Sequence, residues 1–147
     1  MTWTTGLLAG VAQLLHDAGA GVWRGDGTAY TATETGIYIT QAPPEPDTAI
    51  VLAAYPADDT DDGGSGVLQA IQAITRAGTT DTTAVIALDD AVTDALHGIT
   101  NRAVGGVHIT RMWRQSGAPI GPDAAGRHQI SSNYYANAAR HTPLRSE

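Results

Sequence analysis

Two segments of the chain repeat apolar residues at the spacing of an amphipathic helix, whereas the other apolar runs favour strands. The chain is therefore expected to combine two helices with a sheet, which excludes all-α and all-β folds. The first helix is expected from Thr4 to Gly19 and the second from Asp81 to Gly98. Thr4 or Thr5 can cap the first helix, Asp81 or a neighbouring threonine can cap the second, and glycine suits both ends. Their apolar stripes comprise Leu7, Leu8, Val11, Leu14, Leu15 and Ala18 in the first helix, and Val85, Leu88, Val92, Leu96 and Ile99 in the second.

Five runs favour β-strands: residues 36–40, 48–56, 67–78, 103–117 and 126–140. The first two flank QAPPEPD, whose prolines suit a stiff turn, so we expect them to form a hairpin. Residues 67–78 also fit helical spacing, and we interpret them as a strand because the run is short and flanked by glycines. The last two runs are predicted to be strands joined by APIGPDAA.

This order of elements predicts an α+β fold, in which a mostly antiparallel sheet carries both main helices on one face. At 147 residues the chain is expected to form a single domain, residues 1–147, with 143–147 as a loosely ordered tail. It contains no cysteine, so packing rather than disulfides must hold the fold. The start of the chain lacks the positively charged region of a signal peptide, and we expect a protein kept inside a cell or in a particle assembled there.

Charge argues against a nucleic-acid-binding protein. Eight basic residues, all arginine, stand against fifteen acidic ones, and the formal net charge is −7, whereas neutralising phosphates requires a cationic surface. The densest acidic run resembles a calcium loop but lacks ligands at Thr60 and Gln69, so we expect a solvated tip. Its aspartates are Asp58, Asp59, Asp61 and Asp62. The exposed face of the second helix is expected to carry Asp89, Asp90 and Asp94.

No arrangement of residues indicates catalysis, a cofactor or a metal site. The five histidines are scattered, and none pairs with another at the i, i+4 spacing of a helical metal site. Ser65 lies in GGSGV, which lacks the second glycine of a nucleophile elbow, and neither a P-loop nor a G-x-G-x-x-G motif occurs. We therefore expect no catalytic, cofactor-binding or metal-binding residues and predict that the protein is not an enzyme.

The last strand has two chemically distinct faces. One face is apolar and suits the core: Ile130, Tyr134, Ala136 and Ala138. The other is polar without being charged, which suits contact with another protein better than contact with bulk water: Gln129, Ser131, Asn133, Tyr135 and Asn137. Trp113 and Arg114 on the preceding strand are further candidate interface anchors. The predicted interface is Trp113, Arg114, Gln129, Asn133, Tyr135 and Asn137.

Three stretches resemble the minor capsid or tail terminator proteins of long-tailed bacteriophages of actinobacteria. They are the N-terminal WTTGLLAGVAQLLHDAGAGVWRGDGTAYTATETGIYI, the strand IVLAAYP, and the closing GGVHITRMWRQSGAPIGPDAAGRHQISSNYYANAAR. The resemblance runs in order from Trp3 to about Pro143. LQAIQAITRAG departs from it, because this segment is richer in alanine than the third strand of that family.

The resemblance implies a structural virion protein with a small α+β fold. Such proteins close into a hexameric ring that caps the tail tube, meets the head–tail connector or stopper protein, and leaves a channel for DNA. The expected place is the tail–neck region of a virion assembled in the host cytoplasm, with no membrane partner. Asp58, Asp59, Asp61 and Asp62, or the helix aspartates, are expected to face the channel or an axial partner, where negative charge keeps passing DNA from adhering. Another neck component, or a small α/β enzyme or ligand-binding domain, is the alternative.

Overall fold

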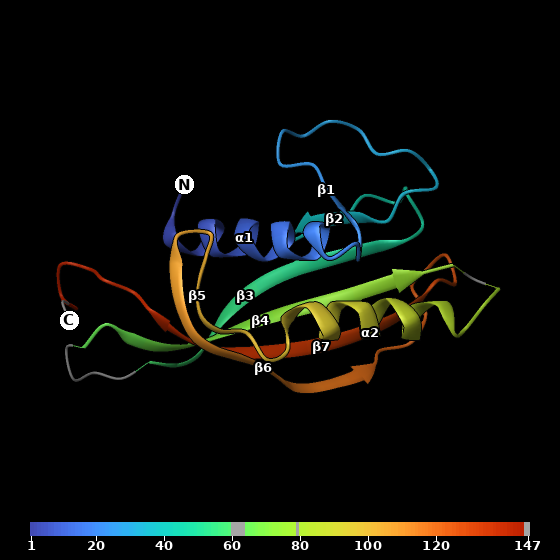
Figure 1. The fold of residues 1–147 in the computed structure, drawn as a ribbon. Coiled ribbons are helices and arrows are strands. Elements are labelled where there is room, and N and C mark those ends of the chain that lie inside the picture. The colour runs from blue at the N-terminus through green and yellow to red at the C-terminus, as the bar shows by residue number, and fades with distance from the viewer. Residues whose placement is uncertain (60–63, 79, 146–147) are drawn as a thin grey trace.

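The computed structural model describes residues 1–59, 64–78 and 80–145, which form one seven-stranded sheet with two helices on one face (Figure 1). The strand order is β1-β2-β3-β4-β7-β6-β5, and all neighbours pair antiparallel except β1 with β2 and β2 with β3. The predicted α+β architecture is confirmed. The elements are α1 (Trp3–Asp17), β1 (Val22–Trp23), β2 (Gly36–Ile39), β3 (Ala49–Asp59), β4 (Gly66–Ala77), α2 (Ala84–Leu96), β5 (Thr100–Val104), β6 (Val107–Pro119) and β7 (His128–Ala139).

Helix α1 starts one residue earlier than predicted. Thr2 is its N-cap, and the Thr2 side-chain oxygen accepts a hydrogen bond from the Thr5 amide at 3.2 Å, so the prediction that Thr4 or Thr5 caps the helix is wrong. Leu7, Val11 and Leu15 are fully buried, as the apolar stripe predicts. Gly19 has a φ of 80°, the left-handed conformation expected just beyond a helix end.

Helix α2 is shorter than the predicted range from Asp81 to Gly98. One carboxylate oxygen of Asp81 accepts hydrogen bonds from the Thr83 amide at 2.9 Å and the Thr83 hydroxyl at 2.6 Å. These bonds form a turn ahead of the helix, which has Thr83 as its N-cap residue. Gly98 lies beyond the last helical turn with a φ of 99°.

Strands β2 and β3 run parallel, so the predicted hairpin between residues 36–40 and 48–56 is wrong. Gly36 lies beside Ala49 and Ile39 beside Leu52, which means that the chain returns to the start of β2 before it enters β3. The return path is the proline loop, residues 41–47. The prolines stiffen this loop as expected, but they do not make it a tight turn.

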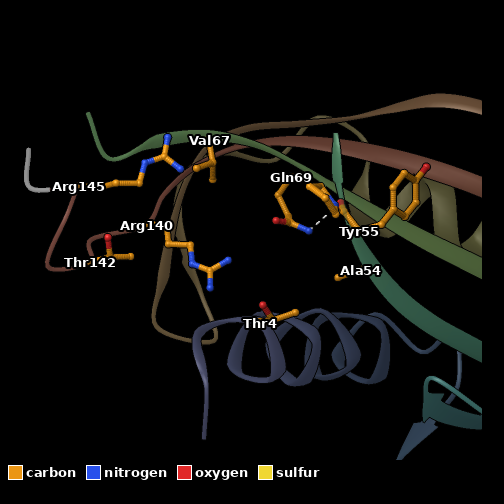
Figure 2. Close-up of a pocket in the computed structure, with 9 residues that line it drawn as sticks. Thr4, Ala54, Tyr55, Val67, Gln69, Arg140, Thr142 and Arg145 are labelled. Carbon is orange, nitrogen blue, oxygen red and sulfur yellow. Dashed lines mark hydrogen bonds between the residues drawn. The ribbon is translucent and has the colours of Figure 1, made fainter. Parts of the chain in front are cut away.

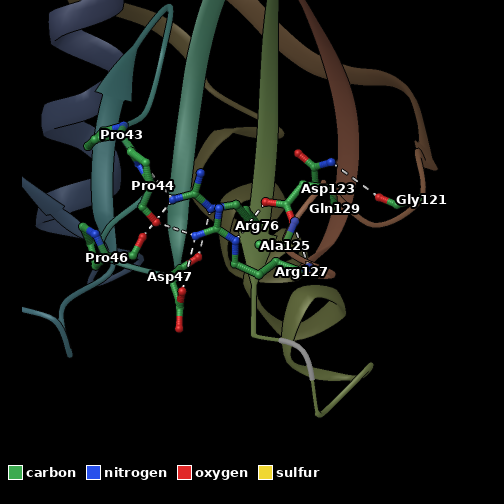
Figure 3. A network of polar contacts seen from close by, with 10 residues as sticks. All are labelled: Pro43, Pro44, Pro46, Asp47, Arg76, Gly121, Asp123, Ala125, Arg127 and Gln129. Atoms are coloured by element: carbon green, nitrogen blue, oxygen red, sulfur yellow. Dashed lines mark hydrogen bonds and ion pairs between the residues drawn. The ribbon is translucent and has the colours of Figure 1, made fainter.

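Two arginines fix the proline loop in its returning path (Figure 3). Arg76 on β4 donates to the carbonyl oxygens of Asp47 at 3.0 Å, Pro43 at 3.0 Å and Pro46 at 2.8 Å. Arg127, just before β7, donates to the carbonyl oxygen of Pro44. Both arginines belong to segments that follow the proline loop in the chain and are not neighbours of β2 in the sheet. Contacts distant in sequence therefore decide that the loop returns to the start of β2. The local turn residues do not reveal it.

Residues 67–78 form a strand, as predicted, and β4 is paired on both sides, with β3 and with β7. The predicted strand over residues 103–117 is instead divided in two. Gly105 and Gly106 both have positive φ, 58° and 79°, and form the turn between β5 and β6. Gly10 of α1 lies so close to this turn that a Cβ atom at Gly10 would overlap the backbone of Gly105.

The core fills the space between the sheet and both helices. One cluster of buried side chains joins α1, α2 and the central strands. Its largest fully buried member is Tyr134 on β7, whose hydroxyl lies 2.8 Å from that of Thr93 on α2. No helix in the described part of the chain is both long and apolar enough to cross a membrane.

Candidate protein interface on the uncovered sheet face

The face of the sheet that points away from the helices is not covered by another layer in the described residues (Figure 1). Along β7, Ile130, Ser132, Tyr134, Ala136 and Ala138 are buried and alternate with less buried residues. The predicted division of this strand into two faces is confirmed. We call the face away from the helices the uncovered face.

An aromatic row crosses four neighbouring strands on the uncovered face. Tyr55 on β3, Ala70 on β4, Tyr135 on β7 and Trp113 on β6 are successive partners in the strand register. The rings of Trp113 and Tyr135 meet edge to face, with centroids 6.1 Å apart at 72°. Ala70 is fully buried between the tyrosines, because a small side chain at this position is covered by its neighbours.

Arg111 extends the aromatic row at its β6 end. Its guanidinium carbon lies 4.8 Å from the centroid of the Trp113 ring, and no carboxylate in the described part of the chain pairs with it. Tryptophan, tyrosine and arginine are the residue types that carry most binding energy at protein interfaces. The aromatic row with Arg111 therefore has the chemistry of an interface centre.

Amide and hydroxyl side chains beside the aromatic row are bonded to one another. The Tyr55 hydroxyl donates to the side-chain oxygen Oδ1 of Asn133 at 2.8 Å, and the side-chain amide nitrogen of Asn133 donates to the Ser116 hydroxyl at 3.3 Å. The Gln72 amide donates to the Ser131 hydroxyl at 3.1 Å. Partial burial, with a smaller contribution from Tyr135, raises the pKa of Tyr55 above its usual value.

The structure separates the predicted interface residues into two groups. Five of them lie on the uncovered face: Trp113, Gln129, Asn133, Tyr135 and Asn137. Arg114 does not, because consecutive residues of a strand point to opposite faces. Its guanidinium reaches the helix layer and donates to Asp89 of α2 and to Ser132, each at 3.1 Å.

Sequence reasoning missed Tyr55, Gln72 and Arg111. Arg111 and Trp113 are two residues apart on β6, and this spacing could have placed them on the same face. Tyr55 and Gln72 join the surface only through the register of β3 and β4, which needs knowledge of the pairing.

Asp89 was expected on the exposed face of the second helix, and this expectation is wrong. Its side chain is 6% exposed, and its carboxylate accepts from the Ser132 hydroxyl at 2.6 Å and from Arg114 at 3.1 Å. Asp89 lies one turn from Val85, on the buried side of α2. Asp90 and Asp94 are exposed, as predicted.

Only part of the predicted acidic tip can be placed. Asp58 is exposed near the end of β3, in register with Leu68 of β4. For Asp59 the structure describes the backbone alone, and Asp61 and Asp62 lie outside the described residues. Within residues 1–59, 64–78 and 80–145, no group of three His, Cys, Asp or Glu side chains is placed to hold a metal ion.

The fold is shared with a solved virion component. A chain of the structure described as "Virion of native gene transfer agent (GTA) particle" superposes with a TM-score of 0.67 at 20% sequence identity, covering 95% of this chain and 99% of that one. A comparison with curated proteins gives no match. At this identity the superposition shows that the two chains share a fold.

A sequence match places the chain among structural tail proteins and gives its family. A family model described as "Bacteriophage tail terminator protein" matches residues 14–140 of this chain. The chain belongs to that family, and the resemblance seen in its sequence is confirmed.

Proposed function

We propose that the protein is a tail terminator whose copies close into a hexameric ring in the neck of the virion. The ring caps the tail tube, meets the head–tail connector or stopper protein and leaves a channel through which DNA passes. Assembly takes place in the host cytoplasm, and the protein makes or breaks no covalent bond. The match to the tail terminator family supports the terminator role.

The observation that carries the proposal is the aromatic row on the uncovered face. A ring requires a heterologous contact, in which one surface of each copy meets a different surface of the next. Trp113, Tyr135 and Arg111 lie together on the neighbouring strands β6 and β7, so a neighbouring copy would bury the rigid aromatic side chains at little entropic cost. We infer that the uncovered face is one half of the contact between ring subunits.

Polar residues would form the rim of this contact. Gln129, Asn133 and Asn137 lie on the same face as the aromatic row and carry no charge. Asn133 already bonds to Tyr55 and Ser116, so it holds the aromatic row in place before any partner arrives. Preorganised side chains lose less freedom on binding.

The negative charge of the chain fits a DNA channel. Each copy has a formal charge of −7, and six copies around a channel multiply it. Asp58 near the tip of β3, with Asp90 and Asp94 on α2, is exposed and available to face the channel. Duplex DNA carries one negative charge per roughly 1.7 Å, so such a surface repels the duplex and lets it move.

Native mass spectrometry of the chain, alone and mixed with the tube subunit of its particle, tests the ring. The wild type is expected to give hexamers. Trp113→Ala and Tyr135→Ala are expected to keep the monomer folded by circular dichroism and to weaken assembly at least about tenfold, because each removes an interface anchor worth about 2 kcal/mol. Ile86→Ala on α2, which truncates a side chain that is 52% exposed, is the control and should assemble normally. Hexamers of undiminished stability in both aromatic variants would refute the assigned interface.

A further inference from the structure

A cavity with a cationic side chain lies at the opposite side of the sheet from the uncovered face. It has a volume of about 340 Å³, is partly open to solvent, and is lined by the first turn of α1, by β3 and β4, and by the segment after β7 (Figure 2). Arg140, Gln69 and Thr4 line it, with Thr142 and Arg145 at the C-terminal side. Ligand sites of proteins typically start at about 300 Å³, so this space holds two or three residues of a peptide.

Arg140 is held in place without an acidic partner. The Trp3 indole donates to the Ala139 carbonyl oxygen at 3.1 Å, and the Arg140 amide donates to the Ser65 carbonyl oxygen at 2.8 Å. These bonds fix the ring and the backbone, so the guanidinium lies 4.8 Å from the centroid of the Trp3 ring. None of the ion pairs between described residues includes Arg140.

The two arginines that are buried in the described part of the chain use their donors within it, whereas Arg140 is only partly buried. Arg76 donates three hydrogen bonds to carbonyl oxygens, and Arg127 pairs with Asp123 at 2.8 Å. The guanidinium of Arg140 makes no hydrogen bond to the described residues, although it is charged at any physiological pH and has five N–H donors. Figure 2 shows it pointing into the space between Thr4 and Gln69. An anionic group in the cavity would meet these donors.

Gln69 supplies an acceptor in the same cavity. Gln69 is 7% exposed, and its side-chain amide nitrogen donates to the backbone carbonyl oxygens of Tyr55 at 2.9 Å and Ala70 at 3.2 Å. Its side-chain oxygen accepts no hydrogen bond from the described residues and points toward Arg140 (Figure 2). A peptide N–H is a natural donor to this oxygen. The cavity therefore offers cationic donors for a carboxylate and, beside them, an acceptor for a backbone amide.

We propose that this cavity binds a carboxylate-bearing peptide segment of another protein. Arg140 binds the carboxylate, with the Thr4 hydroxyl beside it, and the Gln69 oxygen accepts from a backbone N–H of the same segment. The first turn of α1 also favours negative charge there. Such a site adds a second contact to the protein, and it does not depend on ring formation through the uncovered face.

Nuclear magnetic resonance of the full labelled chain tests the site with two tetrapeptides and one tripeptide. The probes are acetyl-Gly-Asp-Asp-Gly-amide, its Asn-Asn counterpart, and acetyl-Gly-Gly-Ala with a free terminal carboxylate. Either carboxylate peptide is expected to bind and to shift the Trp3 indole and Gln69 side-chain resonances, and the comparison between the two identifies a side-chain or a terminal carboxylate. The Asn-Asn peptide is expected not to bind. Equal binding of the Asn-Asn peptide, no binding by either carboxylate peptide, or stronger binding of inorganic phosphate than of both would overturn the proposal.

Two matched substitutions connect binding to the cavity. Arg140→Gln is expected to lower the affinity for the carboxylate peptide at least about tenfold, because the substitution removes charge-assisted hydrogen bonds. Arg102→Gln, which changes the net charge equally on exposed β5, should leave affinity unchanged. Thr4→Val preserves every charge and is expected to weaken binding about two- to tenfold, so it tests the site even if Arg140→Gln unfolds. Unchanged affinity in a folded Arg140→Gln protein, or in Thr4→Val, would refute the site.

Discussion

The arginines of this chain show how single residues divide between structure and contact. Arg24, Arg114 and Arg127 pair with carboxylates, and Arg76 fixes the proline loop through carbonyl oxygens. By contrast, Arg111 and Arg140 stack on tryptophan rings with no acidic partner in the described part of the chain. We therefore propose that these two arginines, which have the chemistry of interface anchors, lie on the surfaces that meet other molecules.

Asp89→Asn is expected to destabilise the fold by about 1–3 kcal/mol, because hydrogen bonds to a buried charged group contribute that much. The substitution weakens the contact with Arg114 and forces the Ser132 hydroxyl, now 2.6 Å from the carboxylate, to find a different geometry. Asp90→Asn removes the same charge from the exposed neighbour and should change stability by less than about 0.5 kcal/mol. Urea denaturation of both variants measures the difference. Equal stability of the two would show that the Asp89 contacts do not stabilise the fold.

Asp123 should make stability depend on pH. Hydrogen bonds from the Arg127 backbone amide and then from its guanidinium lower the pKa of Asp123 below its usual value. Its contribution is therefore complete above the unfolded-state pKa of about 3.9 and is lost as the pH falls through the lower folded-state pKa. Asp123→Asn should flatten this part of the acid unfolding profile, as followed by circular dichroism, whereas Asp90→Asn should not. If the acid unfolding profile of Asp123→Asn kept the full slope of the wild-type profile, the proposed link between Asp123 protonation and stability would be contradicted.

At the residue scale, sequence patterns predicted the faces but not the partners. The period of two along residues 129–138 correctly separated the core face from the uncovered face. Arg114 and Asp89 were misplaced for the same reason: each was judged by its own charge, whereas in the fold the two side chains pair at 3.1 Å. An ion pair between a strand residue and a helix residue cannot be predicted from the period of the strand or from the period of the helix.

At the scale of elements, the contact of α1 with the β5–β6 turn depends on glycine. A Cβ atom at Gly10 would overlap the backbone of Val104 and Gly105, which cannot move without shifting the hairpin. Gly10→Ala is therefore expected to destabilise the protein by about 1–3 kcal/mol, even though alanine favours a helix by about 1 kcal/mol. Gly66→Ala, at a position where a Cβ atom would meet nothing within 4 Å, is the control. Thermal unfolding compares them, and a stabilised Gly10→Ala would show that the turn is loosely packed.

The elements themselves were largely predictable, while their connections were not. Two helices and the β4 strand follow from periodicity and flanking glycines. The parallel pairing of β2 with β3 does not, because the hydrogen bonds that settle it come from Arg76 and Arg127, which follow the proline loop by 29 residues or more along the chain. The turn at Gly105 was overlooked because the apolar run continues on both sides of it.

At the scale of the whole molecule, the exposed carboxylates of α2 are separate from the proposed contact surface. The uncovered face has amide side chains and aromatic rings along β7 and β6, whereas Asp90 and Asp94 are exposed on α2, which packs on the other face of the sheet. An acidic face separate from the subunit contact is what a ring around DNA requires, since the contact must close while the channel must repel. The proposed ring therefore predicts a position for α2 as well as an interface.

If α2 lines the channel, Asp90→Lys combined with Asp94→Lys should make the assembled ring bind duplex DNA. Reversing these exposed charges replaces repulsion with attraction to phosphates, and the affinity should fall steeply with salt. Asp17→Lys combined with Glu45→Lys makes the same change of net charge at exposed positions outside α2 and is the matched control. Fluorescence anisotropy of a labelled duplex at several salt concentrations measures both, with the wild-type ring expected not to bind. Equal DNA binding by the two double variants would show that net charge alone acts, and α2 would then have no special place at the channel.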